Sequence, residues 1–493
     1  MSVTAAPRSQ FGLALLTSFV ASAIVLVVEI LANRAVAPYV GLTLQSVSVI
    51  IGTVLAAIAA GAALGGPLAD RFEPRSVIAA LFVAGGALTA LTPAVFRWLG
   101  PRTDAGSATS LIVLVAAGVA LPGATLSAVP PCAVKAGLRG LDRAGRVAGG
   151  VSAVSTTGAI VGTFLTGFLL VSEVPTAAAF VGVGTAASGF GVALAVWARW
   201  QPRWWIGGVG VILLAGIGGW RSPAPCDHES AYRCIRVEPV AGDPDGRLLR
   251  LDTGRHSYVN ISDPTKLDFA YSKTFADVVD TEFPRGEPIR AVHIGGGGFT
   301  IPRYVDATRP GSTNVVLELD PALEELARRE LGLDPVGTFR TLAGDARITL
   351  RDEPEASFDV AFGDAFNHLA VPWHLTTREF LEEVRSRLVP DGLYVLNVID
   401  YPPRRFLAAE VRTIRQVFDH VSVLAPGDLL FGARSGGNYV VVASDRELAV
   451  DLYADGPRRG PIAVLSDDEL GELIRDASVL TDDFAPADQL LGR

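Results

Sequence analysis

Charged residues are scarce in this sequence: Asp, Glu, Lys and Arg make up only 19% of its 493 residues, whereas apolar residues make up 49%. The mean hydropathy of +0.37 is too high for an ordinary soluble protein of this length. A disordered chain is excluded as well, because disorder requires few apolar residues and many charges. Metal-binding residues are also few. The six histidines and three cysteines show none of the paired spacings of zinc sites, so we expect no metal.

The few charges are unevenly distributed along the chain. Residues 1–221 carry a net charge of +7, and residues 222–493 carry −16. This asymmetry places the main boundary near residue 221, between a lipid-embedded part and an acidic soluble part. We expect no nucleic-acid partner, because an acidic domain repels phosphate groups.

Long apolar runs fill the first part. Each approaches the roughly 20 residues that a helix needs to cross a hydrocarbon core about 30 Å thick. We therefore predict a multi-span α-helical membrane domain at residues 1–221, with the lipid bilayer as its partner. The first run is too long for a cleaved signal peptide and is followed by further spans, so it should act as an anchor. The seven predicted spans are 11–33, 45–68, 76–97, 108–130, 148–171, 174–197 and 203–220.

The cations that flank these spans predict the orientation of the chain. With the N-terminus inside, inner segments hold nine Lys or Arg residues and outer segments hold four. Because cations collect on the cytoplasmic side, we expect a multi-pass protein of the cell membrane with a cytoplasmic N-terminus. Seven spans then place the soluble part outside the cytoplasm. A disulfide between Cys226 and Cys234 would agree with this, but two free thiols fit the sequence nearly as well.

After residue 248, short β-rich runs alternate with amphipathic helices. This alternation predicts an α/β Rossmann-like domain, of the S-adenosylmethionine-methyltransferase-like type, on a parallel sheet at residues 286–493. A small β-region and a connecting helix are expected before it, at residues 222–285.

Four predicted strands end in residues that suit a nucleoside. Glycines let the backbone turn sharply and approach a ligand, and an acid about twenty residues later can accept hydrogen bonds from ribose hydroxyls. Ligands of open α/β sheets bind at the carboxyl ends of strands, so we predict one site there. The strand ends are the glycines 295–298 after the strand 290–294, Glu318 in 314–319, Asp345 in 341–346 and Asp364 in 358–364.

The glycine pattern helps to distinguish between nucleoside ligands. The loop reads GGGG rather than G-x-G-x-x-G, and Asp345 suits the edge of an adenine. Together these features favour an adenosyl sulfonium compound over NAD.

The sequence also resembles a known family. Residues 222–493 resemble spermidine synthases, which are polyamine aminopropyltransferases, and the whole chain resembles the membrane-fused spermidine synthase-like proteins. The similar stretches are EILANRAVAPYVG (29–41), HSYVN (256–260), DFAY (268–271), IGGGGFTIPRY (294–304), LELDP (317–321), GDA (344–346), FGDAFNHLAVPWHLTT (362–377), LVPDGLYVLNVID (388–400) and TDDFAP (481–486).

The resemblance implies a role for each matching residue. Asp364 is expected to be the catalytic base, which takes a proton from the attacking amine. Tyr271 matches a position that lines the acceptor pocket, although packing would explain a tyrosine in an amphipathic helix equally well. For the donor, Gly295, Gly296 and Gly297 are expected to approach the nucleoside and its sulfonium chain, Glu318 to hold the ribose, and Asp345 and Ala346 to meet the adenine.

Two departures from the family pattern affect the substrates. In soluble spermidine synthases the glycine loop ends with an aspartate that holds the amine of decarboxylated S-adenosylmethionine, whereas this chain has Gly298. The acid three residues after the catalytic aspartate, which helps to hold the diamine, is replaced by Asn367, followed by His368, and we expect these two residues to bind the acceptor. Both S-adenosylmethionine and its decarboxylated form therefore stay open as co-substrates.

The family resemblance implies a membrane-anchored enzyme of polyamine biosynthesis that transfers an aminopropyl group to an amine or polyamine. Methyl transfer from S-adenosylmethionine is the second hypothesis, because the missing aspartate serves the decarboxylated donor. The third is a non-catalytic nucleoside- or polyamine-binding domain fused to a transporter-like membrane domain. An outward-facing domain favours the third, because adenosyl donors are made in the cytosol. A homodimer also stays open.

Overall fold

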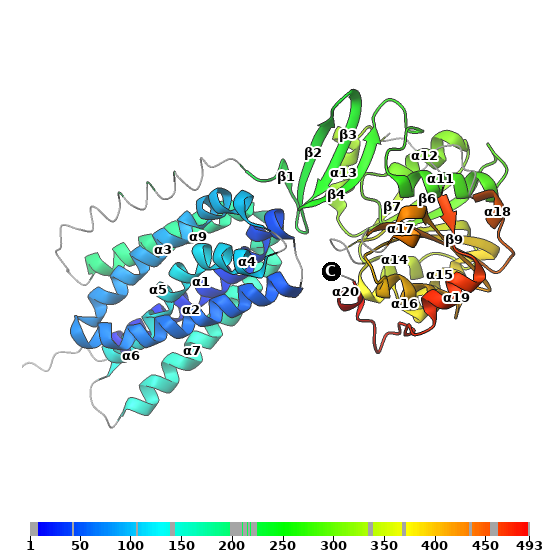
Figure 1. Ribbon diagram of the computed structural model, residues 1–493. Coiled ribbons are helices and arrows are strands. Elements are labelled where there is room, and N and C mark those ends of the chain that lie inside the picture. The colour runs from blue at the N-terminus through cyan, green and yellow to red at the C-terminus, as the bar shows by residue number, and fades with distance from the viewer. Residues whose placement is uncertain are drawn as a thin grey trace, which may run out of the picture. The chain divides into compact units, whose positions relative to one another are not determined.

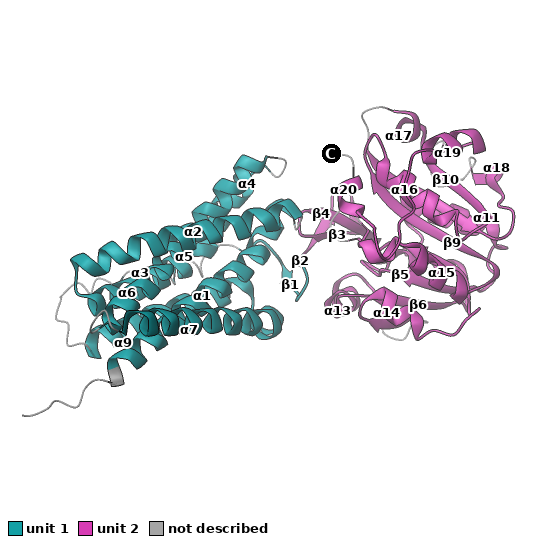
Figure 2. Ribbon diagram, turned by 90° about the horizontal axis from the view of Figure 1, so that it is seen from below, with its two compact units in different colours: residues 1–234 teal, residues 235–493 magenta. Residues whose placement is uncertain are grey.

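Long apolar helices make up unit 1, residues 1–234, and an α/β arrangement makes up unit 2, residues 235–493 (Figure 2). This computed structural model describes residues 8–41, 44–104, 107–138, 143–197, 224–333, 339–366, 371–432, 436–453 and 462–491, together with 210, 214 and 217.

Within these residues, six helical segments of unit 1 are long and apolar enough to cross a membrane. They confirm the predicted multi-span helical fold (Figure 1). Apart from residues 210, 214 and 217, the seventh predicted span lies outside the described residues. The helices are α1 (Arg8–Val40), α2 (Leu44–Arg71), α3 (Pro74–Leu99), α4 (Ala108–Val115), α5 (Leu121–Ser127), α6 (Val129–Gly137), α7 (Ala144–Leu165), α8 (Val171–Glu173) and α9 (Thr176–Trp197), with the π-helical turns η2 (Ala116–Ala120) and η4 (Thr166–Leu170) between α4 and α5 and between α7 and α8.

Glycines allow α1 and α7 to approach each other closely. A Cβ atom on Gly158 would lie 2.2 Å from the carbonyl oxygen of Phe19, and one on Gly162 would lie 2.4 Å from that of Ala23. Larger residues at these two positions would push the helices apart. Small residues at helix contacts are typical of membrane bundles, where close packing replaces the hydrophobic effect between helices.

An ion pair ties the last described part of unit 1 to its first helix. A guanidinium nitrogen of Arg34, near the end of α1, lies 3.0 Å from Glu229 in the short strand β1 (His228–Glu229). Glu229 also accepts a hydrogen bond from the amide of Thr176, the first residue of α9. Residues 228–229 therefore lie at the end of the bundle where α1 ends. A disulfide joins Cys226 to Cys234, on either side of residues 228–229. The sequence had left open whether these two cysteines form a disulfide or remain free thiols.

Unit 2 begins with a small antiparallel sheet of β2 (Cys234–Val240), β3 (Asp243–Leu251) and β4 (Gly254–Asn260). The helix α11 (Ala270–Glu282) connects it to an eight-stranded sheet of order β12-β10-β11-β9-β8-β5-β6-β7. This confirms the predicted Rossmann-like domain preceded by a β-region. The strands are β5 (Arg290–Ile294), β6 (Thr313–Glu318), β7 (Phe339–Ala343), β8 (Phe358–Gly363), β9 (Leu388–Asp400), β10 (His420–Pro426), β11 (Gly437–Ser444) and β12 (Ile462–Val464).

The sequence predicted a parallel sheet, but the large sheet is mixed. Strands β5 to β9 pair in parallel, but β11 pairs antiparallel with both β9 and β10, and β12 pairs antiparallel with β10. Only residues 427–436 connect β10 to β11. A parallel pair needs a crossover of about a dozen residues or more, so this connection is too short for one.

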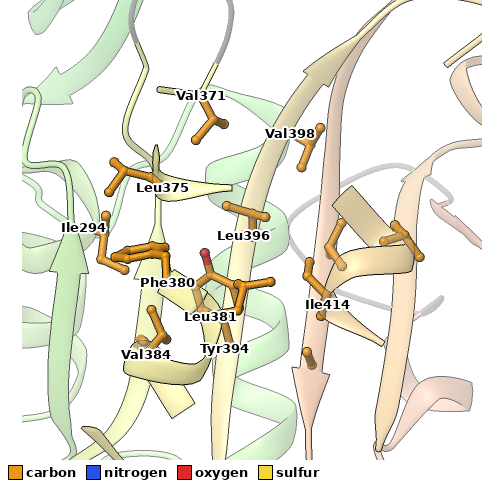
Figure 3. Packing of buried hydrophobic residues seen from close by; sticks show 14 of the residues in the cluster. Ile294, Val371, Leu375, Phe380, Leu381, Val384, Tyr394, Leu396, Val398 and Ile414 are labelled. Atoms are coloured by element: carbon orange, nitrogen blue, oxygen red, sulfur yellow. The ribbon is translucent and has the colours of Figure 1, made fainter. Parts of the chain in front are cut away.

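Helices cover both faces of the large sheet. One face packs against α14 (Ala346–Arg351), α15 (Arg378–Arg387), α16 (Arg405–Ile414), α19 (Asp467–Ile474) and α20 (Ala487–Leu490). Figure 3 shows Phe380 and Leu381 of α15 against Ile294 and Leu396 of the sheet. The other face packs against α11, α12 (Thr300–Thr308) and α18 (Val450–Tyr453). Since both faces are buried, the edge at the carboxyl ends of β5 to β9 is where polar side chains can gather.

Candidate active site

Backbone hydrogen bonds join the ends of four neighbouring strands into one row. Each bond continues the sheet by one residue beyond its regular strands, so the loops that leave β5, β6, β7 and β8 start side by side. The predicted nucleoside residues consequently lie at one edge of the sheet. The three bonds run from Asp364 N to Ile294 O, from Gly295 N to Leu317 O and from Gly344 N to Glu318 O, each 2.9 Å long.

The glycine loop lies directly against Asp364. Gly295 has a φ angle of +96°, which favours glycine. A Cβ atom at this position would lie only 2.5 Å from the backbone carbonyl oxygen of Asp364. The absence of a side chain at Gly295 therefore lets the ends of β5 and β8 approach each other.

Phe299, which follows the glycines, packs into an apolar cluster. Phe299 is the residue before α12, and its φ angle of +58° lies in the left-handed region. Its side chain is fully buried and packs with Val316 and Leu323 between the large sheet, α13 (Pro321–Glu330) and the small sheet. This apolar packing holds an unusual backbone conformation.

Glu318, the predicted ribose ligand, is buried and holds the glycine loop. One carboxylate oxygen accepts hydrogen bonds from the amides of Gly296 (2.8 Å) and Gly297 (3.1 Å), and the other accepts from Asp320 (2.9 Å). Burial raises the pKa of Glu318, and these amides oppose that shift. Because a carboxylate can accept about four hydrogen bonds, at least one acceptor position is left for a ligand.

Asp345 does not end a strand as predicted, because β7 stops at Ala343. Asp345 instead caps α14, where one carboxylate oxygen accepts a hydrogen bond from the amide of Arg347 at 2.9 Å. The other oxygen lies 2.9 Å from Nε2 of His374. Ala346 follows as the first residue of the helix and is buried. The pairing of His374 with Asp345 could not be predicted from the sequence, because the two residues lie on separate elements.

Asp364 follows β8 and has a hydrogen bond to each carboxylate oxygen. The hydroxyl of Tyr271 in α11 donates to Oδ2 at 2.9 Å, and Nδ2 of Asn397 in β9 donates to Oδ1 at 2.9 Å. Burial raises the pKa of Asp364 to about 7, although both hydrogen bonds act in the opposite direction. Asn397 lies in one of the stretches that resemble the family, but nothing in the sequence assigned it a role.

Large apolar side chains remain exposed beside these polar groups. Leu319, which follows Glu318, is 47% exposed, and Ile348 in the first turn of α14 is 65% exposed. Side chains of this kind suit the faces of an adenine. Sequence reasoning missed both residues, because an apolar side chain after an acid or in a helix is usually expected to pack in the core.

Two predicted acceptor residues, Asn367 and His368, lie outside the described residues. Within the part of the chain that the structure describes, no group of three or more His, Cys, Asp or Glu residues is arranged to hold a metal ion.

Sequence comparisons relate the chain to polyamine aminopropyltransferases, while no family model matches it. It is 28% identical to polyamine aminopropyltransferase 2 of Streptomyces coelicolor over 359 residues, which cover 66% of this chain and 63% of that protein. It is 32% identical to the polyamine aminopropyltransferase of Vibrio vulnificus over 134 residues, which cover 27% of this chain and 44% of that protein. The chain thus spans less than two thirds of the length of either relative. These matches confirm the predicted resemblance.

Among solved structures, the chain is similar to a probable spermidine synthase from Corynebacterium glutamicum. The identity is 28% and the TM-score is 0.49, and the match covers 52% of this chain and 96% of that one.

Proposed function

We propose that this protein is a membrane-anchored aminopropyltransferase, in which Asp364 removes a proton from an amine that attacks an adenosyl sulfonium donor. The surroundings of Asp364 carry the proposal: its backbone lies against the glycine loop, and its two oxygens are held by Tyr271 and Asn397. A pKa of about 7 suits a base that must accept and release a proton near neutral pH. The sequence similarity to polyamine aminopropyltransferases supports the reaction type.

The reaction needs a base but no covalent enzyme intermediate. The nitrogen lone pair of the amine attacks the methylene carbon that is bonded to the sulfonium. A carbon–nitrogen bond forms, the carbon–sulfur bond breaks, and its electron pair goes to sulfur, which becomes a neutral thioether. The proton of the amine goes to Asp364, whose negative charge also stabilises the cation that develops on nitrogen.

The edge of the sheet offers the groups that this donor requires. Gly295, Gly296 and Gly297 carry no side chains, so their backbone is proposed to approach the donor closely, as the family resemblance implies. Glu318 keeps an acceptor position for a ribose hydroxyl. Asp345, at the start of α14, would accept a hydrogen bond from the adenine amine, and the adjacent Ala346 would contact the ring. The donor is a co-substrate here, and no metal takes part in the proposal.

The acceptor side is proposed to take an amine or polyamine. Residues 222–493 carry a net charge of −16, which raises the local concentration of cations. The Tyr271 hydroxyl reaches the base, so an amine bound beside it would have its nitrogen close to Asp364. Asn367 and His368 stay predicted acceptor residues, as the family resemblance implies.

Methyl transfer is the second candidate, and Gly298 favours it. A Cβ atom on Gly298 would lie 2.8 Å from Cβ of Ser257 and 3.1 Å from Val259. This position therefore has no room for the acid that holds the amine of a decarboxylated donor in soluble spermidine synthases. Without that acid, S-adenosylmethionine itself competes more readily for the site.

The bundle supports the proposed orientation in the membrane. Arg34 and Glu229 place residues 228–229 at the end of unit 1 where α1 ends, whereas the N-terminus lies at the other end of α1. If α1 spans the bilayer, these two points lie on opposite sides of it. With a cytoplasmic N-terminus, unit 2 then begins outside the cytoplasm, where a disulfide between Cys226 and Cys234 persists. Alkaline phosphatase fused to the C-terminus should then be active, and an inactive fusion together with a fluorescent GFP fusion would contradict this orientation.

Asp364→Asn tests the proposed base. The full chain, purified in detergent, is expected to bind the adenosyl donor within a few-fold of wild type, but kcat for transfer should fall by about 10² to 10⁴. Asp359→Asn is the matched control, because Asp359 is the second residue of the same strand, lies at the other end of it from Asp364 and pairs with Arg290. Its kcat should stay near wild type. Turnover by Asp364→Asn within tenfold of wild type would rule out Asp364 as the base.

A further inference from the structure

Three side chains form a hydrogen-bonded line that leads away from Asp364. Nδ2 of Asn397 donates to Asp364, and Oδ1 of the same amide accepts from Nδ2 of Asn438, both at 2.9 Å. Asn397 is 2% exposed, so its amide has no water to turn towards. Asn438 therefore touches the base only through Asn397.

The mixed sheet brings these three residues together. β9 is parallel to β8, so Asn397 lies beside the end of β8. β11 runs antiparallel to β9, so its first residues reach the edge where the parallel strands end. Asn397 is paired with Val440, and Asn438 lies two residues before Val440, on the same face as Asn397.

We infer that Asn438 is a positioning residue for the proposed base: it holds the Asn397 amide in the orientation that donates to Asp364. This inference rests on the proposed function. An ionised carboxylate can only accept hydrogen bonds, so Asn397 must present its NH₂ group to Asp364. Its carbonyl oxygen then faces away and needs a donor, which is the NH₂ group of Asn438.

The opposite orientation of the amide would favour the opposite state of the base. If Asn397 turned its oxygen to Asp364, that oxygen would need a donor, and Asp364 could supply one only when protonated. A residue at position 438 that can only accept hydrogen bonds would stabilise this turned amide. The protonation of Asp364 is thus coupled to the chemistry of a side chain that it does not touch.

Among the residues that the structure describes, few other ionisable groups bear on Asp364. From α11 it faces Tyr271, whose pKa is raised by burial and by Asp364. The glycine loop presents backbone, and β9 and β11 present the two amides. The nearest carboxylate on β9, Asp400, is bound to the backbone amides of residues 401 and 407. Glu318 holds the amides of Gly296 and Gly297, and Asp345 caps α14 and contacts His374, so neither is bonded to Asp364.

Asn438→Asp tests the inference, because a carboxylate at 438 accepts and does not donate. The variant should shift the acid limb of the pH–rate profile upward by about one pH unit or more, which lowers the rate at pH 6 about tenfold. Asn438→Leu should give a smaller upward shift, because it frees the Asn397 amide without turning it. Gln416→Glu is the control: it makes the same change from amide to carboxylate at an exposed site and should leave the profile unchanged.

A second readout needs no turnover. The infrared band of a protonated carboxyl group that Asp364→Asn removes should titrate at a higher pH in Asn438→Asp than in wild type, in the purified full chain without substrates. If this band shifts but no amine is alkylated, the inference holds and the proposed function fails. If amines are alkylated but the limb and the band stay in place, the function holds and the inference fails. Equal shifts in Asn438→Asp and Asn438→Leu would also overturn it. If Asn438→Asp does not fold, Asn438→Leu decides, because an unchanged limb in that variant contradicts the inference.

Discussion

Replacing Gly295 by alanine tests whether the glycine loop positions the proposed base. The new Cβ atom would lie 2.5 Å from the carbonyl oxygen of Asp364, whereas real Cβ atoms essentially never approach other heavy atoms below 3.0 Å. The two strand ends must therefore separate by about half an ångström or more. Because a displacement of roughly 1 Å at a reacting group can cost about 10² in rate, we expect kcat to fall between tenfold and a hundredfold.

Gly286→Ala is the matched control for this variant. Gly286 also has a positive φ angle, +79°, but a Cβ atom there meets nothing within 4 Å. Both substitutions should cost about 1–2 kcal/mol of stability from backbone strain, and thermal unfolding of the purified chain measures this cost. Only Gly295→Ala should also lose kcat, measured by donor consumption at saturating substrates. A kcat for Gly295→Ala equal to that of Gly286→Ala would refute the argument from loop contact.

Three further predictions concern the charges of the site. The transfer rate should fall about tenfold per pH unit below pH 7 and be level above it. The reason is that Asp364, with its pKa of about 7, is protonated on the acid side and cannot accept a proton. A pH–rate profile with no acid limb between pH 5 and 8 would contradict this. Glu318→Gln should weaken donor binding about tenfold in calorimetry, because the site loses a charged acceptor for ribose and for the loop amides. Glu324→Gln is the control and should leave donor binding unchanged, because Glu324 pairs with Arg328 on α13. His374→Ala should tighten donor binding a few-fold by freeing one oxygen of Asp345 for the adenine amine; weaker binding would show instead that His374 holds Asp345 in place.

Local patterns were sufficient to predict much of unit 2. The strand 290–294 and the glycines that follow it were predicted where β5 and its loop lie, because an apolar run and a glycine cluster act over a few residues. β7 ends earlier than predicted because Asp345 caps α14, and a cap competes with a strand for the same residue. The direction of β11 and the link from Asn438 to Asp364 depend on the pairing of β9 with β11, about 40 residues apart in the sequence, and no local pattern encodes that choice.

In the membrane part, too, local patterns predict the helices but not the contacts between distant residues. Apolar runs of about 20 residues identify helices directly, so six of the predicted spans correspond to helices of unit 1. The ion pair between Arg34 and Glu229 joins residues about 200 positions apart and could not be predicted from the cation count. The orientation in the membrane stays a prediction.

The mass of the product tests the proposed aminopropyl transfer most directly. The purified full chain is incubated with decarboxylated S-adenosylmethionine and a mixture of diamines and polyamines, and in parallel with S-adenosylmethionine. We expect an amine that has gained one aminopropyl group, together with an equal amount of the methylthioether of adenosine, and neither product with Asp364→Asn. An amine or other acceptor that gains only a methyl group, or donor binding without any product, would contradict it.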